Sequence, residues 1–325
     1  MLTTRFTEMV GCTVPIQQAG MALLAGPDLA VTVAEAGGLG QISIFEYPDP
    51  ARIARVLDDA RTRTHGAIGA NALGPDPHDE LDIACLRAAA SRARVVDYFW
   101  ADPDPKLVEV AHAGGALACW QVGSLAEAIA AERAGCDFII AQGVEAGGHV
   151  RGHIGLLALL TQVLDAVHIP VLAAGGIGSG RAMAAALAAG AAGVRVGTRF
   201  VVAPEAHAHP LYVQALIAAQ PADTIYGDFF NYGWKDAPHR VLRSSVSAAE
   251  AFRGDIVARR LDPDTNAWVE KHRLQSFSVT DQYTGTIEAA PFWAGESVAG
   301  ITRVQTAAEI VTELADEAEA LLRRW

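Results

Sequence analysis

The clearest candidate for chemistry in this sequence is His149, the last residue of the segment Gln142-Gly-Val-Glu-Ala-Gly-Gly-His149. Gly147 and Gly148 have no Cβ atoms, so the backbone there can closely approach the flat ring of a bound cofactor. An imidazole titrates near neutral pH, so His149 beside such a ring could form hydrogen bonds, polarise a bond or exchange a proton. We therefore predict that His149 is catalytic. The alternative is a loop histidine whose hydrogen bonds are made to the backbone.

Two glycine-rich turns are candidates for a phosphate site. Ala173-Ala-Gly-Gly-Ile-Gly-Ser-Gly180 leads from an apolar run into an alanine-rich helix, and exposed N–H groups at such a helix start favour an anion. Arg195-Val-Gly-Thr198 adds more N–H donors, a hydroxyl and a guanidinium. The alternative is that these glycines only form tight turns. The cofactor contacts predicted here are Gly175, Gly176, Arg195, Val196, Gly197 and Thr198.

Earlier apolar runs also end in residues that could contact a cofactor. Asn71 and Gln121 carry side-chain amides that could bind polar edges or hydroxyls of a flavin. Met21 follows the first run and could pack on a ring. For each of the three, a packing role is the alternative.

Two other cofactor classes are poorly supported. His149 and His153 are four residues apart, as in a helical zinc pair, but neighbouring glycines disfavour a helix and the glutamate of H-E-x-x-H is missing. We expect no metal site. The glycines at 176, 178 and 180 do not match G-x-G-x-x-G, which argues against a nicotinamide dinucleotide fold.

These residues lie at the ends of short apolar runs that alternate with helical patterns. The runs are predicted strands at 14–18, 39–43, 67–72, 95–99, 116–121, 138–142, 170–174 and 193–197. Strands that alternate with helices pair in parallel, and eight such units close into an α/β (β/α)8 TIM barrel, whose catalytic groups lie at the carboxyl ends of the strands. An open doubly wound sheet is the alternative.

The pattern changes after about residue 200. Aromatic residues cluster between 226 and 234, and Thr306-Ala-Ala-Glu309 is a capping box that opens an amphipathic helix. We expect residues 1–200 to form the cofactor-binding barrel. Residues 201–325 are expected to form a smaller, mostly helical segment over the barrel mouth, whose last helix could return to the barrel.

Composition excludes several classes of protein. The net charge is −12 without a cluster of Lys and Arg, which argues against nucleic acid as a partner. The four cysteines form no C-x-x-C pair. No apolar run is long enough to span a bilayer, and the first residues lack the continuous core of a signal peptide. We expect a cytoplasmic enzyme without a membrane partner.

Together these motifs resemble the nitronate monooxygenase family, the 2-nitropropane dioxygenase-like flavoproteins. The resemblance covers residues 10–205 and depends on Gln142-Gly-Val-Glu-Ala-Gly-Gly-His149, Ala174-Gly-Gly-Ile177 and Arg195-Val-Gly-Thr198, with support from Asn71 and the segment ending at Met21. It implies noncovalent FMN, contacted by Asn71, Gln142, Gly147, Gly176 and the turn that begins at Arg195. It also implies that His149 is the catalytic residue.

The activity implied by the resemblance is oxidation of an alkyl nitronate, or of a nitroalkane, by O2 to a carbonyl compound and nitrite. The first loop, the Trp120-Gln121 strand end and residues 226–243 depart from the family pattern, so the substrate stays open. The main alternative is a flavin-type enoyl-ACP reductase that uses NAD(P)H. A non-enzymatic flavin-binding protein and a flavin-free phosphosugar barrel enzyme are further alternatives. A homodimer is one of the assemblies that the sequence allows.

Overall fold

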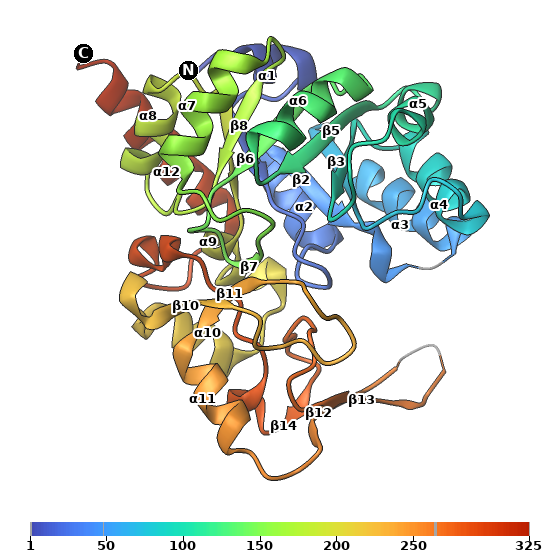
Figure 1. Cartoon of the computed structure of the whole chain (residues 1–325), viewed down its shortest axis with the longest axis vertical. Helices are drawn as coiled ribbons and strands as arrows, with labels where there is room; N and C mark the ends of the chain where they lie inside the picture. Colours follow the sequence, from blue (N-terminus) through green and yellow to red (C-terminus); the bar gives the residue numbers. More distant parts are fainter. Residues whose placement is uncertain (1, 48, 263–264, 325) are drawn as a thin grey trace.

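Eight parallel strands form a closed barrel in the computed structural model, which describes residues 2–47, 49–262 and 265–324 (Figure 1). The order around the barrel is β1-β2-β3-β4-β5-β6-β8-β9, and β9 closes on β1. The strand bounds are β1 Ile16–Gln18, β2 Leu39–Ser43, β3 Ala67–Leu73, β4 Val95–Phe99, β5 Leu117–Val122, β6 Phe138–Gln142, β8 Val171–Ala174 and β9 Gly193–Val196. The predicted (β/α)8 barrel is therefore confirmed, with each strand within two residues of its expected bounds.

Helices separate the strands and cover the outside of the barrel. Their bounds are α2 Pro27–Glu35, α3 Pro50–Arg63, α4 Glu80–Ala90, α5 Pro105–Ala113, α6 Leu125–Ala134, α7 Leu156–Ala166 and α8 Gly180–Ala188. Pro27 is in the first turn of α2, where its fixed φ favours a helix. Ser124 caps α6 and Ser179 caps α8, and each accepts from an N–H group that has no partner within the helix.

The barrel interior is apolar and closed at its amino-terminal end. The short helix α1, Arg5–Val10, lies across this end, and its Phe6 packs edge-on against Phe138 with ring centroids 5.4 Å apart. Leu39, Val95 and Leu172 belong to the same buried cluster. Because this end is filled with side chains, a ligand can enter the barrel only from the carboxyl ends of the strands.

Residues after the barrel form a second body below its mouth in Figure 1. Its helices are α9 Thr198–Val201, α10 Pro210–Ala218, α11 Arg243–Ala251 and α12 Ala307–Leu322. It also contains two small sheets that the sequence did not predict, ordered β10-β11-β7 and β13-β12-β14. Their strands are β7 Gly148–His149, β10 Thr224–Gly227, β11 His239–Leu242, β12 Ile256–Leu261, β13 Trp268–His272 and β14 Thr284–Gly285.

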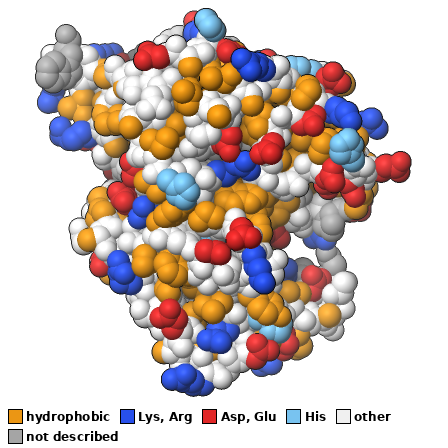
Figure 2. All heavy atoms as spheres, in the orientation of Figure 1, with side chains coloured by type: hydrophobic (Ala, Val, Ile, Leu, Met, Phe, Trp, Pro, Cys, Tyr) orange, Lys and Arg blue, Asp and Glu red, His pale blue; other side chains and the backbone are white. Residues whose placement is uncertain are grey.

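Two connections join this segment to the barrel. The last helix, α12, runs back and packs against α8 and α2. At the mouth, β11 pairs antiparallel with the two-residue strand β7, which contains His149. On the face shown in Figure 2, hydrophobic side chains gather where the barrel meets the lower segment, and Lys and Arg are interspersed with Asp and Glu. No helix in the described part of the chain is both long and apolar enough to cross a membrane.

Candidate active site

A cavity of about 450 Å³ lies at the carboxyl ends of the barrel strands. The residues singled out in the sequence all line it: Met21, Asn71, Gln121, Gln142, Gly147, Gly148, His149, Gly175, Gly176, Arg195, Val196, Gly197 and Thr198. The fold therefore brings these residues together at one site, although they span most of the barrel sequence. Their individual roles stay predictions.

The glycines at the cavity are required for different physical reasons. Gly148, Gly175 and Gly176 have positive φ angles of 72°, 110° and 69°, a region that favours glycine. A Cβ atom on Gly148 would meet nothing within 4 Å, so there is open space beside it. At Gly147, by contrast, a Cβ atom would lie 2.4 Å from the backbone nitrogen of Gly295. The backbone of Gly295 therefore packs closely against Gly147, whereas the space beside Gly148 is open to a ligand.

Arg195 is directed into the barrel rather than toward the glycine turn. Its guanidinium forms an ion pair with Asp97, and both side chains are almost fully buried. The amide of Asn71 donates to the same Asp97 carboxylate over 3.0 Å. Because the charge of Arg195 is already compensated, the backbone N–H groups around Gly176 and Thr198 are the better candidates for holding a phosphate.

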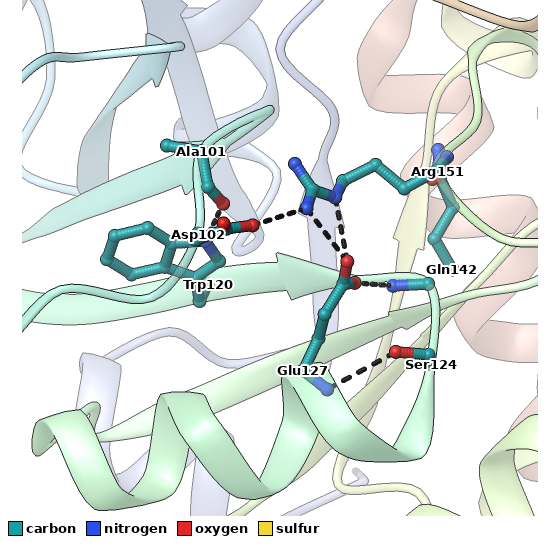
Figure 3. A network of polar contacts seen from close by, with 8 residues as sticks. Ala101, Asp102, Trp120, Ser124, Glu127, Gln142 and Arg151 are labelled. Carbon is teal, nitrogen blue, oxygen red and sulfur yellow. Dashed lines mark hydrogen bonds and ion pairs between the residues drawn. The ribbon is translucent and has the colours of Figure 1, made fainter.

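Gln142 holds the segment that contains His149. Its amide nitrogen donates to the His149 carbonyl over 3.0 Å, and its amide oxygen accepts from the Arg151 backbone N–H over 3.4 Å. The Arg151 guanidinium in turn pairs with Glu127 at 2.9 Å and Asp102 at 2.8 Å, as Figure 3 shows. This network anchors the loop after His149 to the ends of the neighbouring strands.

The imidazole of His149 is held at both ring nitrogens. Nδ1 lies 3.1 Å from the carbonyl oxygen of Ala237, and Nε2 lies 3.2 Å from the hydroxyl of Ser276. A carbonyl oxygen can only accept, so Nδ1 carries the proton and Nε2 presents its lone pair to the Ser276 hydroxyl. Burial, and then the nearby His239, lower the pKa of His149 to about 4. His149 is therefore neutral at pH 7.

Three tryptophans surround this imidazole. The ring centroid of Trp234 lies 4.2 Å from that of His149, and Trp100 and Trp293 lie at 5.3 and 5.4 Å. Trp234 and Trp293 line the cavity together with Phe277. The ring nitrogen that can take a proton thus faces a chamber with largely apolar walls, where a small substrate is shielded from water.

Only part of the aromatic-rich segment at 226–234 reaches the cavity. Trp234 lines it, whereas the Tyr226 hydroxyl bonds to His153 over 3.2 Å and Phe230 is buried in the core. Tyr232 is 53% exposed and packs on His272. Of these aromatic residues, Trp234 is therefore the one placed to cover a substrate in the cavity.

Several residues at the site were not expected from the sequence. Asp97 could have been found, because it is a single carboxylate within the apolar run at 95–99. Ser276 and the carbonyl of Ala237 carry no comparable signal, since they are ordinary residues more than 80 positions from His149. Trp100 has a left-handed φ of 62°, which no local pattern predicts for a tryptophan.

Comparison with known proteins gives a consistent picture. The family model for nitronate monooxygenase matches residues 3–317. A probable nitronate monooxygenase of Staphylococcus aureus is 30% identical over 336 residues, covering 90% of this chain and 91% of the relative. A Rhodococcus jostii protein, (3aS,4S,5R,7aS)-5-hydroxy-7a-methyl-1-oxo-octahydro-1H-indene-4-carboxyl-CoA dehydrogenase, is 34% identical over 267 residues, covering 80% of this chain and 72% of the relative.

Solved structures resemble the whole chain. FabK from Thermotoga maritima superposes with a TM-score of 0.80 and 27% identity, covering 100% of this chain and 98% of that one. Nitroalkane oxidase from Streptomyces ansochromogenes superposes with a TM-score of 0.77 and 28% identity, covering 98% of this chain and 99% of that one. The likeness therefore includes the segment below the barrel mouth as well as the barrel.

Proposed function

We propose that this chain, which belongs to the nitronate monooxygenase family, is an FMN-dependent enzyme. In this proposal it oxidises alkyl nitronates with O2 to a carbonyl compound and nitrite. Membership makes it an oxidoreductase of a flavin-dependent family that acts on small molecules. The observation that carries the finer proposal is the position of His149, whose unprotonated Nε2 faces a cavity lined by glycine turns and tryptophans.

The donor set of the cavity fits FMN. The turn through Gly175 and Gly176 leads to the amino terminus of α8, and together they offer N–H groups to a single phosphate. The open space beside Gly148 can accept the edge of a flat ring, and Asn71 and Gln121 lie on the same cavity wall. A bound flavin would accept electrons from the substrate and transfer them to O2.

The protein's own contribution to the reaction centres on His149. Because it is neutral, His149 can accept the Cα proton of a nitroalkane at Nε2. The Ser276 hydroxyl has one proton, which it donates to Nε2 of His149; when a substrate binds, this proton would turn to an oxygen of the nitro group and leave the Nε2 lone pair for the Cα proton. Trp234 and Trp293 exclude water and leave room for a small apolar substituent. A nitronate has already lost the Cα proton, so it needs only the hydrogen bond from Ser276 and the apolar walls, and not a base.

Anaerobic mixing of the purified protein with propionate 3-nitronate tests the proposal. We expect the flavin absorbance to be bleached by this substrate alone, and nitrite to form once O2 is admitted. The Rhodococcus relative is named a dehydrogenase of a carboxyl-CoA, and the enoyl-ACP reductase alternative requires NAD(P)H. Bleaching by NAD(P)H and not by the nitronate would overturn the proposed oxidation in favour of the reductase.

A further inference from the structure

His239 is a fully buried histidine that lies opposite His149 in the small sheet at the barrel mouth. The two residues are register partners on β11 and β7, with ring centroids 5.5 Å apart. His239 is not among the residues that line the cavity, so it is not placed to touch a substrate. One of its hydrogen bonds is nevertheless made to a carbonyl that also bonds His149, and two are made to the segment that leads to Trp234.

The hydrogen bonds of His239 fix its protonation. Its Nε2 accepts from two consecutive backbone N–H groups, those of Phe229 at 3.2 Å and Phe230 at 3.1 Å. Nε2 must therefore carry a lone pair, and the proton resides on Nδ1. That proton is donated to the carbonyl oxygen of Ala237 over 2.9 Å. Burial lowers the pKa of His239, which favours the same neutral form.

The carbonyl of Ala237 connects the two histidines. It accepts from Nδ1 of His239 and also from Nδ1 of His149, at 2.9 and 3.1 Å. The second of these bonds keeps the proton of His149 on Nδ1 and so leaves Nε2 free toward Ser276 and the cavity. The orientation of one carbonyl group thus determines which nitrogen of His149 faces the substrate.

The acceptor nitrogen of His239 holds a second element of the site. Phe229 and Phe230 begin the chain segment that continues to Trp234, whose ring lies 4.2 Å from His149. A turn closed by the Trp234 N–H and the Asn231 carbonyl, 3.1 Å apart, links the held residues to this ring. If the N–H groups of Phe229 and Phe230 lost their bonds to His239, the start of this segment would be free to move, and the position of the Trp234 ring would be less well fixed.

We propose that His239 is a positioning residue: its Nε2 clamps the backbone at Phe229 and Phe230, which leads to Trp234, and its Nδ1–H holds the Ala237 carbonyl, so that His149 keeps its Nε2 lone pair toward the cavity. The role of His149 rests on the proposed function, whereas the clamp rests on the contacts alone. A histidine that only fills the core would satisfy the same N–H groups without controlling His149.

Two amide variants distinguish the roles of the two ring nitrogens of His239. His239→Gln places an amide oxygen near the former Nε2 and can still accept from the backbone at 229 and 230. His239→Asn reaches only the former Nδ1 position, so it keeps a donor for Ala237 and loses the clamp. Both side chains are polar, and neither adds volume to the core. Val257→Ala, a buried position in β12, serves as a control for general loss of stability.

The measurement is a ¹H–¹⁵N spectrum of the flavin-loaded protein labelled in its histidines, with the His149 signals assigned through His149→Ala. We expect the Nδ1–H tautomer of His149 in the wild type, in His239→Asn and in Val257→Ala, and a mixture of tautomers in His239→Gln, because His239→Gln lacks the donor to the Ala237 carbonyl. We also expect kcat of His239→Gln to fall about tenfold to a hundredfold below that of His239→Asn, as for a misplaced catalytic group.

The results for His239 can be interpreted whether or not the proposed function is correct. Unchanged His149 signals in His239→Gln, or equal changes in both amide variants, would overturn this positioning role. If the wild type oxidises no nitronate, the proposed activity fails, but the spectra still decide whether His239 controls the tautomer of His149.

Discussion

Arg195 and Asp97 form an ion pair inside the barrel, with side-chain exposures of 4% and 0%. A buried pair of this kind contributes little net stability, because both charges lose their hydration, but removal of one partner leaves an uncompensated charge. The pair therefore constrains the carboxyl-terminal half of the barrel, next to the cavity that Arg195 lines.

Replacement of Asp97 by alanine should lower the free energy of unfolding by about 3–5 kcal/mol, because the Arg195 charge would stay buried without a partner. Denaturant unfolding measures this loss. The double variant Asp97→Leu, Arg195→Met is the control, and it should recover most of the stability. An Asp97→Ala midpoint equal to that of the wild type would contradict the importance of the pair.

The protein should purify with FMN, and Gly176→Glu should abolish its binding. The left-handed backbone at Gly176 disfavours any side chain, and a carboxylate there would repel a phosphate at the same turn. Gly11→Glu is the matched control, since Gly11 has a φ of 84° at the opposite end of the barrel. Mass spectrometry of the released cofactor decides between FMN and FAD, and FAD would refute the single-phosphate site.

His149→Ala should retain the flavin but lose turnover, by about 10²–10⁴ in kcat/KM, the usual cost of losing an acid–base group. The control is His153→Ala, because His153 lies on the same loop and pairs with Tyr226 outside the cavity. Flavin content from the absorption spectrum and nitrite release under O2 are the two measurements. A loss below about tenfold in kcat/KM would mean that another group is the base.

The pH dependence follows from the lowered pKa of His149. The folded protein binds the proton less tightly than the unfolded chain, so stability falls as the pH decreases from the ordinary value of 6.5 toward about 4. The neutral base persists over the same range, so kcat/KM for a nitroalkane should stay level down to about pH 5. Rate profiles and unfolding midpoints at several pH values check both statements. A rate decline centred near 6.5 would indicate an unshifted histidine.

Trp234→Ala should change KM or substrate preference with little loss of melting temperature, because this ring covers the cavity beside His149. Tyr232→Ala is the matched control from the same segment, since Tyr232 is exposed and packs on His272. Steady-state kinetics with nitronates of increasing size, together with thermal melts, give the comparison. A lower melting temperature with unchanged kinetics would assign Trp234 a structural role.

The sequence alone determines the barrel and the location of the candidate site. Buried parallel strands are short apolar runs with glycine, proline or a capping residue at their borders, and these signals are local. Once eight such units are assigned, the closed barrel places every strand end at one mouth. For this reason residues as distant in the chain as Met21 and Thr198 could be predicted to share a cavity without knowledge of their contacts.

Only the tertiary structure decided how the site is completed. His149 depends on Ala237 and Ser276, which are 88 and 127 residues away, and Arg195 depends on Asp97, 98 residues away. Such pairs are set by how the segment after the barrel folds over the mouth and by which side chains point inward. The strands that make this closure are short: β10 and β11 have four residues each and β7 has two, so they leave no periodic pattern in the sequence. The protonation of the His149 imidazole is consequently a property of the fold, since long-range hydrogen bonds and burial determine it.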